Sequence, residues 1–129
     1  MIEANMRELM RTFNPGERLI EKEALGEGEA ALLRALVDGL PDEIVVVRTE
    51  KGHRAYVNRC RHISVPLDYG DGEVFDESGK MFQCRTHGAL YRIEDGRCVA
   101  GPCSGASLIS VEIVEKEDGV YLPDEVEDL

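Results

Sequence analysis

The sequence predicts a small all-β domain built from antiparallel strands. The chain has 129 residues, of which 43% are hydrophobic, enough for one compact core and too few for two domains. From Arg18 onward, short apolar runs alternate with turns that carry glycine, which is the spacing of an antiparallel β fold. Two of these turns, Asp95-Gly96 and Asp118-Gly119, are dipeptides that favour tight β-hairpins.

The apolar runs are the expected strands. In chain order they span residues 43–48, 54–58, 80–83, 90–93, 108–114 and 120–122. Further turns are expected at Lys51-Gly52 and Ser78-Gly79, which separate neighbouring runs. The segment 29–37, EAALLRALV, has helical propensity by itself, but the β pattern around it favours a strand there too.

Both ends of the chain differ from this body. Apolar residues recur at helical spacing between residues 2 and 13, so a short amphipathic helix or a frayed arm is expected before Asn14-Pro15-Gly16. The residues after Pro123 form an acidic tail. The expected organisation is an N-terminal arm or short helix at 1–16, one domain at 17–122 and a tail at 123–129.

Charge and cysteine content narrow the function classes. The chain carries 26 acidic and 15 basic residues, so a general role on nucleic acid or an anionic membrane would oppose its own field. A protein partner with a basic docking face fits better. The first twenty residues hold no apolar run long enough for a signal peptide or a membrane span, and a soluble cytoplasmic protein is expected. In that reducing compartment, four cysteines favour metal binding or buried thiols over disulfides.

Two short segments place a cysteine beside a histidine. RCRHISVPL, residues 59–67, contains Cys60 and His62, and QCRTHGALY, residues 83–91, contains Cys84 and His87. These four side chains could bind a tetrahedral zinc ion, but zinc fingers usually pair Cys with Cys and His with His. One thiolate and one imidazole from each loop suit two unlike irons, one bound by both sulfurs and the other by both nitrogens, as in a Rieske [2Fe-2S] centre. Two buried histidines beside inert thiols would leave the matched pairing unexplained.

At these residues the sequence resembles the Rieske ferredoxin family, over about residues 17–122. The family pattern of C-x-H, a following Pro-Leu and C-x-x-H-G is matched by Cys60, His62, Pro66-Leu67, Cys84, His87 and Gly88. Gly101-Pro102 matches the turn that lies over the cluster in this family. The resemblance implies an antiparallel β sandwich or partly open barrel, with the cluster ligands in a small subdomain at one end. The 21 residues between the two motifs exceed the usual spacing, and a longer hairpin around 76–79 is expected.

The resemblance also indicates a branch of the family. High-potential members carry two further cysteines that bridge the ligand loops, and often a serine two residues after the second histidine. Here those positions are Val65, Thr86 and Ala89, while the aromatic position is kept as Tyr91. Fewer donors to the cluster sulfurs imply a potential low in the Rieske range, roughly −150 to 0 mV. This favours the soluble low-potential branch, such as the ferredoxin components of aromatic-ring hydroxylating dioxygenase systems.

The function that the resemblance implies is a one-electron carrier between a reductase and a terminal oxygenase or similar oxidoreductase, an electron-transfer component rather than a stand-alone catalyst. An electron-transfer subunit or redox-sensing module of a larger enzyme is the alternative, and a zinc-stabilised interaction module is a further one. A terminal oxygenase needs a mononuclear iron with two more histidines, whereas only His53 is left, and that is expected to be a surface residue.

Two sets of residues near the motifs stay open. Three arginines tune the cluster, mark a docking edge or contribute only to solubility: Arg59, Arg61 and Arg85. Cys98 and Cys103 flank the Gly-Pro turn, and packed thiols are favoured there over a disulfide.

Overall fold

The computed structural model describes residues 11–61, 66–68, 73–84, 88–103 and 105–124, and every regular element within them is a β-strand. The all-β prediction is confirmed. The strands are β1 (Thr12–Phe13), β2 (Arg18–Glu21), β3 (Ala30–Val37), β4 (Leu40–Thr49), β5 (Gly52–Val57), β6 (Met81–Gln83), β7 (Leu90–Arg92), β8 (Cys98–Ala100), β9 (Val114–Lys116) and β10 (Gly119–Tyr121). In the described part of the chain, no helix is long and apolar enough to cross a membrane.

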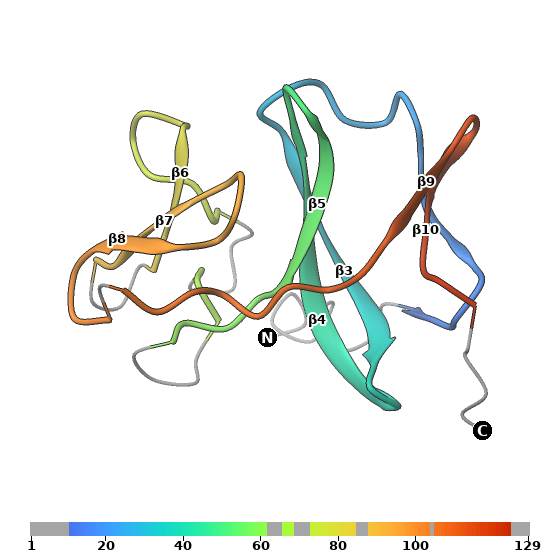
Figure 1. Ribbon diagram of the computed structural model, residues 1–129, viewed down its shortest axis with the longest axis horizontal. Coiled ribbons are helices and arrows are strands. Elements are labelled where there is room, and N and C mark those ends of the chain that lie inside the picture. The colour runs from blue at the N-terminus through green and yellow to red at the C-terminus, as the bar shows by residue number, and fades with distance from the viewer. Residues whose placement is uncertain (1–10, 62–65, 69–72, 85–87, 104, 125–129) are drawn as a thin grey trace, which may run out of the picture.

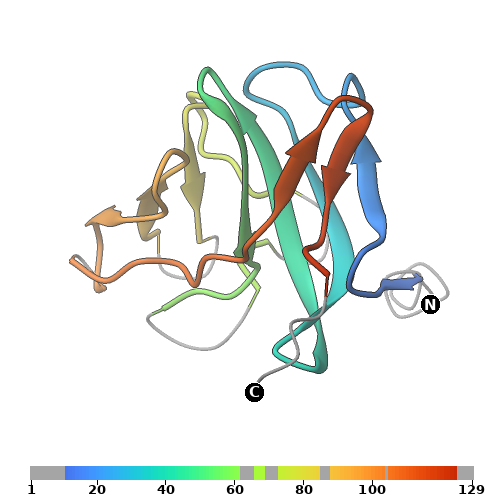
Figure 2. The same cartoon turned by 45° about the vertical axis from the view of Figure 1, so that its right-hand side comes forward.

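Three sheets make up the fold. The central sheet has the strand order β1-β3-β4-β5, and two smaller sheets have the orders β2-β10-β9 and β6-β7-β8. The smaller sheets lie on opposite sides of the central one (Figures 1 and 2). All pairings are antiparallel except that of β1 with β3, which is parallel. The result is a sandwich-like body with a separate three-stranded lobe at one end.

Strand β4 joins two hydrophobic cores. Successive side chains of a strand point to opposite faces, so an uninterrupted apolar run is expected where both faces are covered. Val45 and Val47 accordingly belong to the core under the β6-β7-β8 lobe, and Ile44 and Val46 to the core under the β2-β10-β9 sheet. All four side chains are fully buried. The IVVV run therefore positions the lobe as well as the body.

The expected strands are present except at 108–114, and the structure adds strands that were not expected. The segment 29–37 is a strand, β3, despite its helical propensity, because eight of its residues pair with β4. The expected strand at 108–114 is instead an extended connection along β5, joined to it by Val57 N to Ile109 O at 2.8 Å and Val111 N to Ala55 O at 2.9 Å. Strands β1, β2 and β8 were not expected, and β9 begins at Val114, the last residue of the expected run. Of the predicted N-terminal helix, residues 2–10 lie outside the described residues and Thr12–Phe13 form β1.

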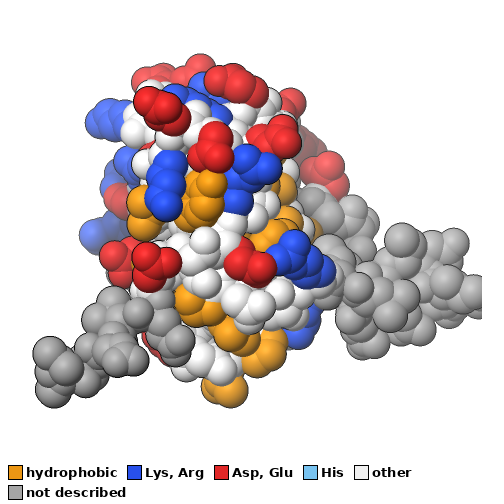
Figure 3. Space-filling view, turned by 90° about the vertical axis from the view of Figure 1, so that its right-hand side faces the viewer, with side chains coloured by type: hydrophobic (Ala, Val, Ile, Leu, Met, Phe, Trp, Pro, Cys, Tyr) orange, Lys and Arg blue, Asp and Glu red, His pale blue; other side chains and the backbone are white. Residues whose placement is uncertain are grey.

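The face over the β2-β10-β9 sheet carries acidic and basic side chains side by side (Figure 3). Arg18 on β2 lies 3.3 Å from Asp118 and 3.8 Å from Glu21, all three exposed to solvent. Exposed pairs of this kind contribute little to stability and keep the surface solvated. This face lies on the far side of the central sheet from the lobe.

Candidate functional site

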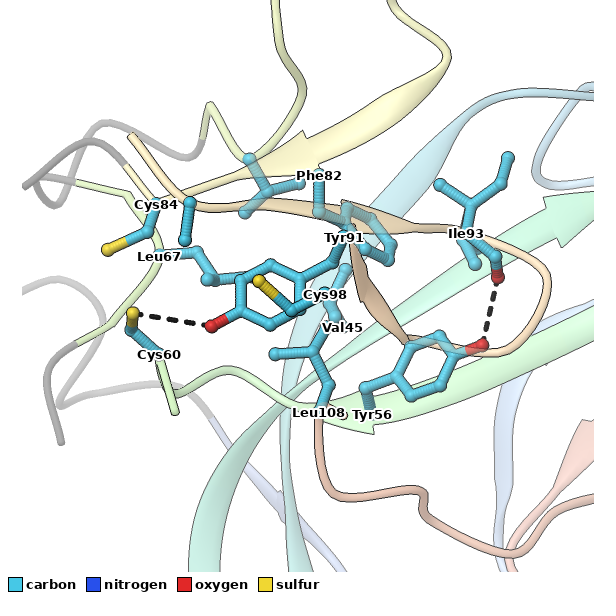
Figure 4. Close-up of a cluster of buried hydrophobic side chains, with 13 residues drawn as sticks. Val45, Tyr56, Cys60, Leu67, Phe82, Cys84, Tyr91, Ile93, Cys98 and Leu108 are labelled. Carbon is cyan, nitrogen blue, oxygen red and sulfur yellow. Dashed lines mark hydrogen bonds between the residues drawn. The ribbon is translucent and has the colours of Figure 1, made fainter. Parts of the chain in front are cut away.

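Two of the four predicted cluster ligands lie in the described residues, and both are at the end of the lobe core. Cys60 follows β5 and Cys84 follows β6 directly. Each is buried, with 2% and 0% of its surface exposed, and both belong to the same core as Leu67 and Tyr91 (Figure 4). His62 and His87 lie outside the described residues. Two thiols far apart in the chain are thus brought to one buried place.

Asn58 holds the backbone on both sides of the first ligand segment, which is the first Cys-His motif at residues 59–67. This buried side chain donates from Nδ2 to Glu43 Oε1 at 2.8 Å and to Asp68 Oδ1 at 3.2 Å, and its Oδ1 accepts from Leu67 N at 3.0 Å. It therefore ties the chain just before Cys60 to the chain that returns at Leu67. Buried polar groups satisfied in this way specify one backbone arrangement. Sequence reasoning missed this residue, and only the position of Asn58 two residues before Cys60 could have drawn attention to it.

Backbone hydrogen bonds join the two ends of the second ligand segment, which is the second Cys-His motif at residues 83–91. Gly88 N donates to Cys84 O at 2.8 Å, and Cys84 N donates to Ala89 O at 2.9 Å. Gly88 has a φ of 78°, which glycine adopts at no steric cost. The glycine of the C-x-x-H-G pattern is thus required by the turn that returns the chain to β7.

The Gly-Pro turn lies against this second segment. A Cβ built at Gly101 would be 2.7 Å from Ala89 Cα, so only a glycine lets the two backbones approach this closely. The Gly101-Pro102 turn therefore packs against Ala89, and its place over a cluster stays a prediction.

Tyr91 connects Cys60 to Cys103. Its hydroxyl lies 3.4 Å from Cys60 Sγ and 2.9 Å from Cys103 Sγ, and its oxygen accepts a hydrogen bond from Arg61 N at 2.9 Å. Burial first, and then the contacts with the Cys103 and Cys60 sulfurs, raise the pKa of this hydroxyl above its usual value. The hydroxyl therefore keeps its proton. Where Cys60 is a thiolate, its sulfur can only accept, so the hydroxyl is then the donor in that contact.

Replacing Tyr91 by phenylalanine is expected to lower the midpoint potential of a centre bound at Cys60. A hydrogen bond to a ligand sulfur stabilises the more negative, reduced state, and a difference of about 1 kcal/mol between the two states corresponds to about 40 mV for one electron. Protein-film voltammetry measures this shift. Tyr56→Phe is the matched control, since the buried Tyr56 hydroxyl donates to Ile93 O at 2.9 Å, away from the cysteines (Figure 4). Equal shifts in both variants would contradict a specific contact with Cys60.

The described donors fit a Rieske centre. Two buried thiols from separate segments suit the inner iron, which takes two thiolates, and a hydroxyl donor lies next to one of them. Within the described ranges, which leave out His62 and His87, no three metal-ligating side chains come together. All four ligands, Cys60 and Cys84 as well as the two histidines, therefore stay a prediction from the motifs.

The arginines near the motifs differ in their contacts. Arg59 forms a two-point salt bridge with Asp42, at 2.7 and 2.8 Å. Arg61 is exposed and donates to Ser107 O at 3.2 Å. Arg85 lies outside the described residues. The charge of Arg59 is thus balanced locally, whereas Arg61 presents a cation at the surface beside Cys60.

His53 is buried, which corrects the expected surface position. Only 5% of it is exposed, and its Nδ1 lies 2.8 Å from Glu115 Oε1, which also accepts a hydrogen bond from His53 N at 3.2 Å. The contact joins β5 to β9, so this histidine has a structural partner. The turn-like residues before His53 suggested an exposed position, and nothing in the sequence indicated its contact with Glu115.

Comparisons with known proteins agree with this arrangement. A family model described as the Rieske [2Fe-2S] domain matches residues 18–116. No curated protein matches the sequence significantly. The fold is similar to the ferredoxin of carbazole 1,9a-dioxygenase from Nocardioides aromaticivorans IC177, with a TM-score of 0.63 and 23% identity over 86% of this chain and 99% of that chain.

Two further solved structures come from similar systems. The terminal oxygenase of carbazole 1,9a-dioxygenase from Novosphingobium sp. KA1 gives a TM-score of 0.66 and 20% identity, over 89% of this chain and 31% of that chain. A complex of reduced oxygenase and oxidized ferredoxin in carbazole 1,9a-dioxygenase gives a TM-score of 0.60 and 22% identity, over 81% of this chain and 98% of the matched chain. The chain therefore spans nearly a whole ferredoxin and about a third of the oxygenase. At these identities the likeness shows the fold.

Proposed function

The chain belongs to the Rieske [2Fe-2S] domain family, and from this premise we propose that it is a one-electron carrier between a reductase and a terminal oxygenase. The single observation that supports the proposal most is the burial of Cys60 and Cys84 together at the end of one core, next to the Tyr91 hydroxyl. The match to 99% of a dioxygenase ferredoxin supports a carrier of the same kind.

We infer that Cys60, His62, Cys84 and His87 hold the cluster, with the two thiolates on the inner iron and the two imidazoles on the other. When bound, such a cluster takes up and releases one electron at a time. The chain's own residues exclude water from the sulfurs, because both cysteines are buried beside Leu67. Tyr91 holds a proton next to Cys60 and so favours the reduced state.

Partner docking is proposed at the end of the lobe that carries Cys60 and Cys84. A solved complex of similar proteins contains an oxygenase and a ferredoxin, which supports an oxygenase as the acceptor here. Arg61 is an exposed cation at this end, in a chain whose formal net charge is -11. The partner face is therefore expected to carry an acidic group opposite Arg61 within a mainly basic surface, and we place both partners in the cytoplasm.

Stopped-flow transfer tests this function. Anaerobically prepared protein should contain two irons and two acid-labile sulfides per chain, accept an electron from a flavin-dependent ferredoxin reductase and pass it to a Rieske oxygenase. Arg61→Glu should slow transfer about tenfold at low salt, and the difference from the unmodified protein should shrink as salt screens the charges.

Arg18→Glu is the matched control, because it reverses a charge on the far face, where Arg18 pairs with Asp118. Its transfer rate should stay unchanged. One zinc ion and no sulfide would instead support an interaction module, and a cluster that neither partner class can reduce or oxidise would contradict the carrier function.

A Rieske module within a larger enzyme is the second candidate. The match to 31% of a terminal oxygenase supports it, since the same fold serves there as one part of a longer chain. A module of this kind should form a stable complex with one large subunit during gel filtration, whereas a carrier should dissociate between transfers.

A further inference from the structure

Two cysteines outside the predicted ligand set lie in contact with each other. Cys103 Sγ is 3.3 Å from Cys98 Sγ, and the structure holds both as thiols. A disulfide bond is about 2.05 Å long, so the sulfurs need to close by a little over 1 Å to join. Few residues separate the two positions, and the loop between them brings the thiols together.

Backbone hydrogen bonds hold this loop closed. Cys98 N donates to Ala106 O at 2.7 Å, Gly105 N donates to Cys98 O at 3.0 Å, and Ala106 N donates to Cys103 O at 2.9 Å. The segment after Cys103 is thereby paired back onto β8. The contact between the sulfurs is therefore a consequence of backbone pairing rather than of two freely rotating side chains.

The two thiols differ in access. Cys98 is 1% exposed and donates to Ala100 O at 3.2 Å, whereas Cys103 is half-buried. Burial, with the Cys103 contact, raises the pKa of Cys98 to about 11. Cys103 is thus the thiol that a small molecule can reach and that attacks first. Cys98 stays protonated until then, and its contact with the Cys103 sulfur, rather than a low pKa, makes it the resolving cysteine, which gives up its proton as it attacks.

We propose that Cys98 and Cys103 form a thiol-oxidation site that reacts with a low-molecular-weight disulfide and changes the hydrogen bonding of Cys60 through Tyr91. Cys103 sulfur attacks one sulfur of the small disulfide, whose S–S bond breaks and releases one small thiol. Cys98 sulfur then attacks Cys103 sulfur and releases the second small thiol. The protein thiols lose two electrons and two protons, and the small disulfide gains both.

The link to the cluster site is the single proton of Tyr91. Cys103 donates its own proton to Cys98, so as a thiol its sulfur is free to share the Tyr91 proton with Cys60. In the disulfide, Cys103 sulfur moves toward Cys98 and accepts more weakly, which leaves the Tyr91 proton to Cys60. Oxidation should therefore stabilise the reduced centre and shift its midpoint potential upward. This effect rests on the proposed cluster, whereas the thiol chemistry does not.

Peptide mapping tests the thiol chemistry. Trypsin releases residues 98–116 as one peptide that contains Cys98 and Cys103 and no other cysteine. After the cluster-loaded protein is incubated with oxidised glutathione and alkylated, this peptide should be lighter by two hydrogen atoms and carry no alkyl group, and dithiothreitol should restore both thiols. Cys98→Ala should retain a glutathione adduct on Cys103, because nothing resolves it. Two alkylated thiols in the unmodified protein, or a persistent adduct there, would overturn the site.

Voltammetry of the same samples tests the link. The midpoint potential should rise when the disulfide forms in the unmodified protein and stay constant in Tyr91→Phe, where the shared proton is missing. A disulfide without a potential shift, or an equal shift in Tyr91→Phe, would overturn the link. A chain that binds no iron would contradict the proposed function in the iron assay, while the peptide map would still decide the thiol site.

Discussion

Replacing Cys84 by serine is expected to give a folded protein that assembles no [2Fe-2S] centre. Cys84 is 0% exposed at the end of the lobe core, and an iron bound there needs a thiolate. A serine hydroxyl in that buried place keeps its proton and offers a much poorer ligand. The inner iron then loses half of its protein ligands, so iron and sulfide should fall from two per chain to near zero. Colorimetric iron and sulfide assays measure this loss.

Cys98→Ser is the matched control for this substitution. Cys98 lies in the same core and is also buried, but its hydrogen bonds go to Cys103 Sγ and Ala100 O. We expect full iron and sulfide content in this variant. Circular dichroism should show that both variants keep the β fold. Normal iron content in Cys84→Ser, or its loss in Cys98→Ser, would show that the ligand set is wrong.

The fold class could be predicted from the sequence because the glycine turns fall between the short apolar runs, as they do between antiparallel strands. The IVVV run in β4 has no alternation of apolar and polar residues, which is typical of a strand buried on both faces. In the structure both faces of β4 are covered by hydrophobic cores. The same local pattern misled at 108–114, whose residues are apolar enough for a strand but bond to the β5 backbone through Ile109 and Val111 in an extended connection. Strand identity there depends on tertiary partners that a local pattern does not contain.

The candidate site was predictable only as far as its motifs reach. Cys60 and Cys84 could be named because their spacing has a chemical meaning, whereas His53 could not be placed because its partner, Glu115, lies 62 positions further along the chain. Asn58 was missed for the same reason, since its contacts with Glu43 and Asp68 cross between segments. Motifs indicate candidate ligands, and long-range packing decides what surrounds them.

The close approach of Gly101 to the second ligand segment leads to the largest expected effect on stability. Gly101→Ala places a Cβ 2.7 Å from Ala89 Cα, and it also puts a side chain at a φ of 101°, which favours glycine. A non-glycine residue at such a φ costs about 1–2 kcal/mol, and overpacking against a backbone atom adds about 1–3 kcal/mol. The free energy of unfolding of the apoprotein should fall by about 2–5 kcal/mol in urea titrations.

Gly105→Ala separates the two causes, because Gly105 lies in the same loop with a φ of 96° but has nothing within 4 Å of the place that a Cβ would occupy. Both variants lose the same glycine flexibility from the unfolded chain, so the difference between them reports the Ala89 contact alone. We expect Gly105→Ala to cost about 1–2 kcal/mol and to bind the cluster normally. Gly101→Ala should also lose cluster more quickly on dilution, since Ala89 is hydrogen-bonded through its carbonyl to Cys84 N. Equal losses of unfolding free energy in the two variants would mean that the turn moves aside for the methyl group of Gly101→Ala. The Gly-Pro turn would then have no part in holding the second ligand segment.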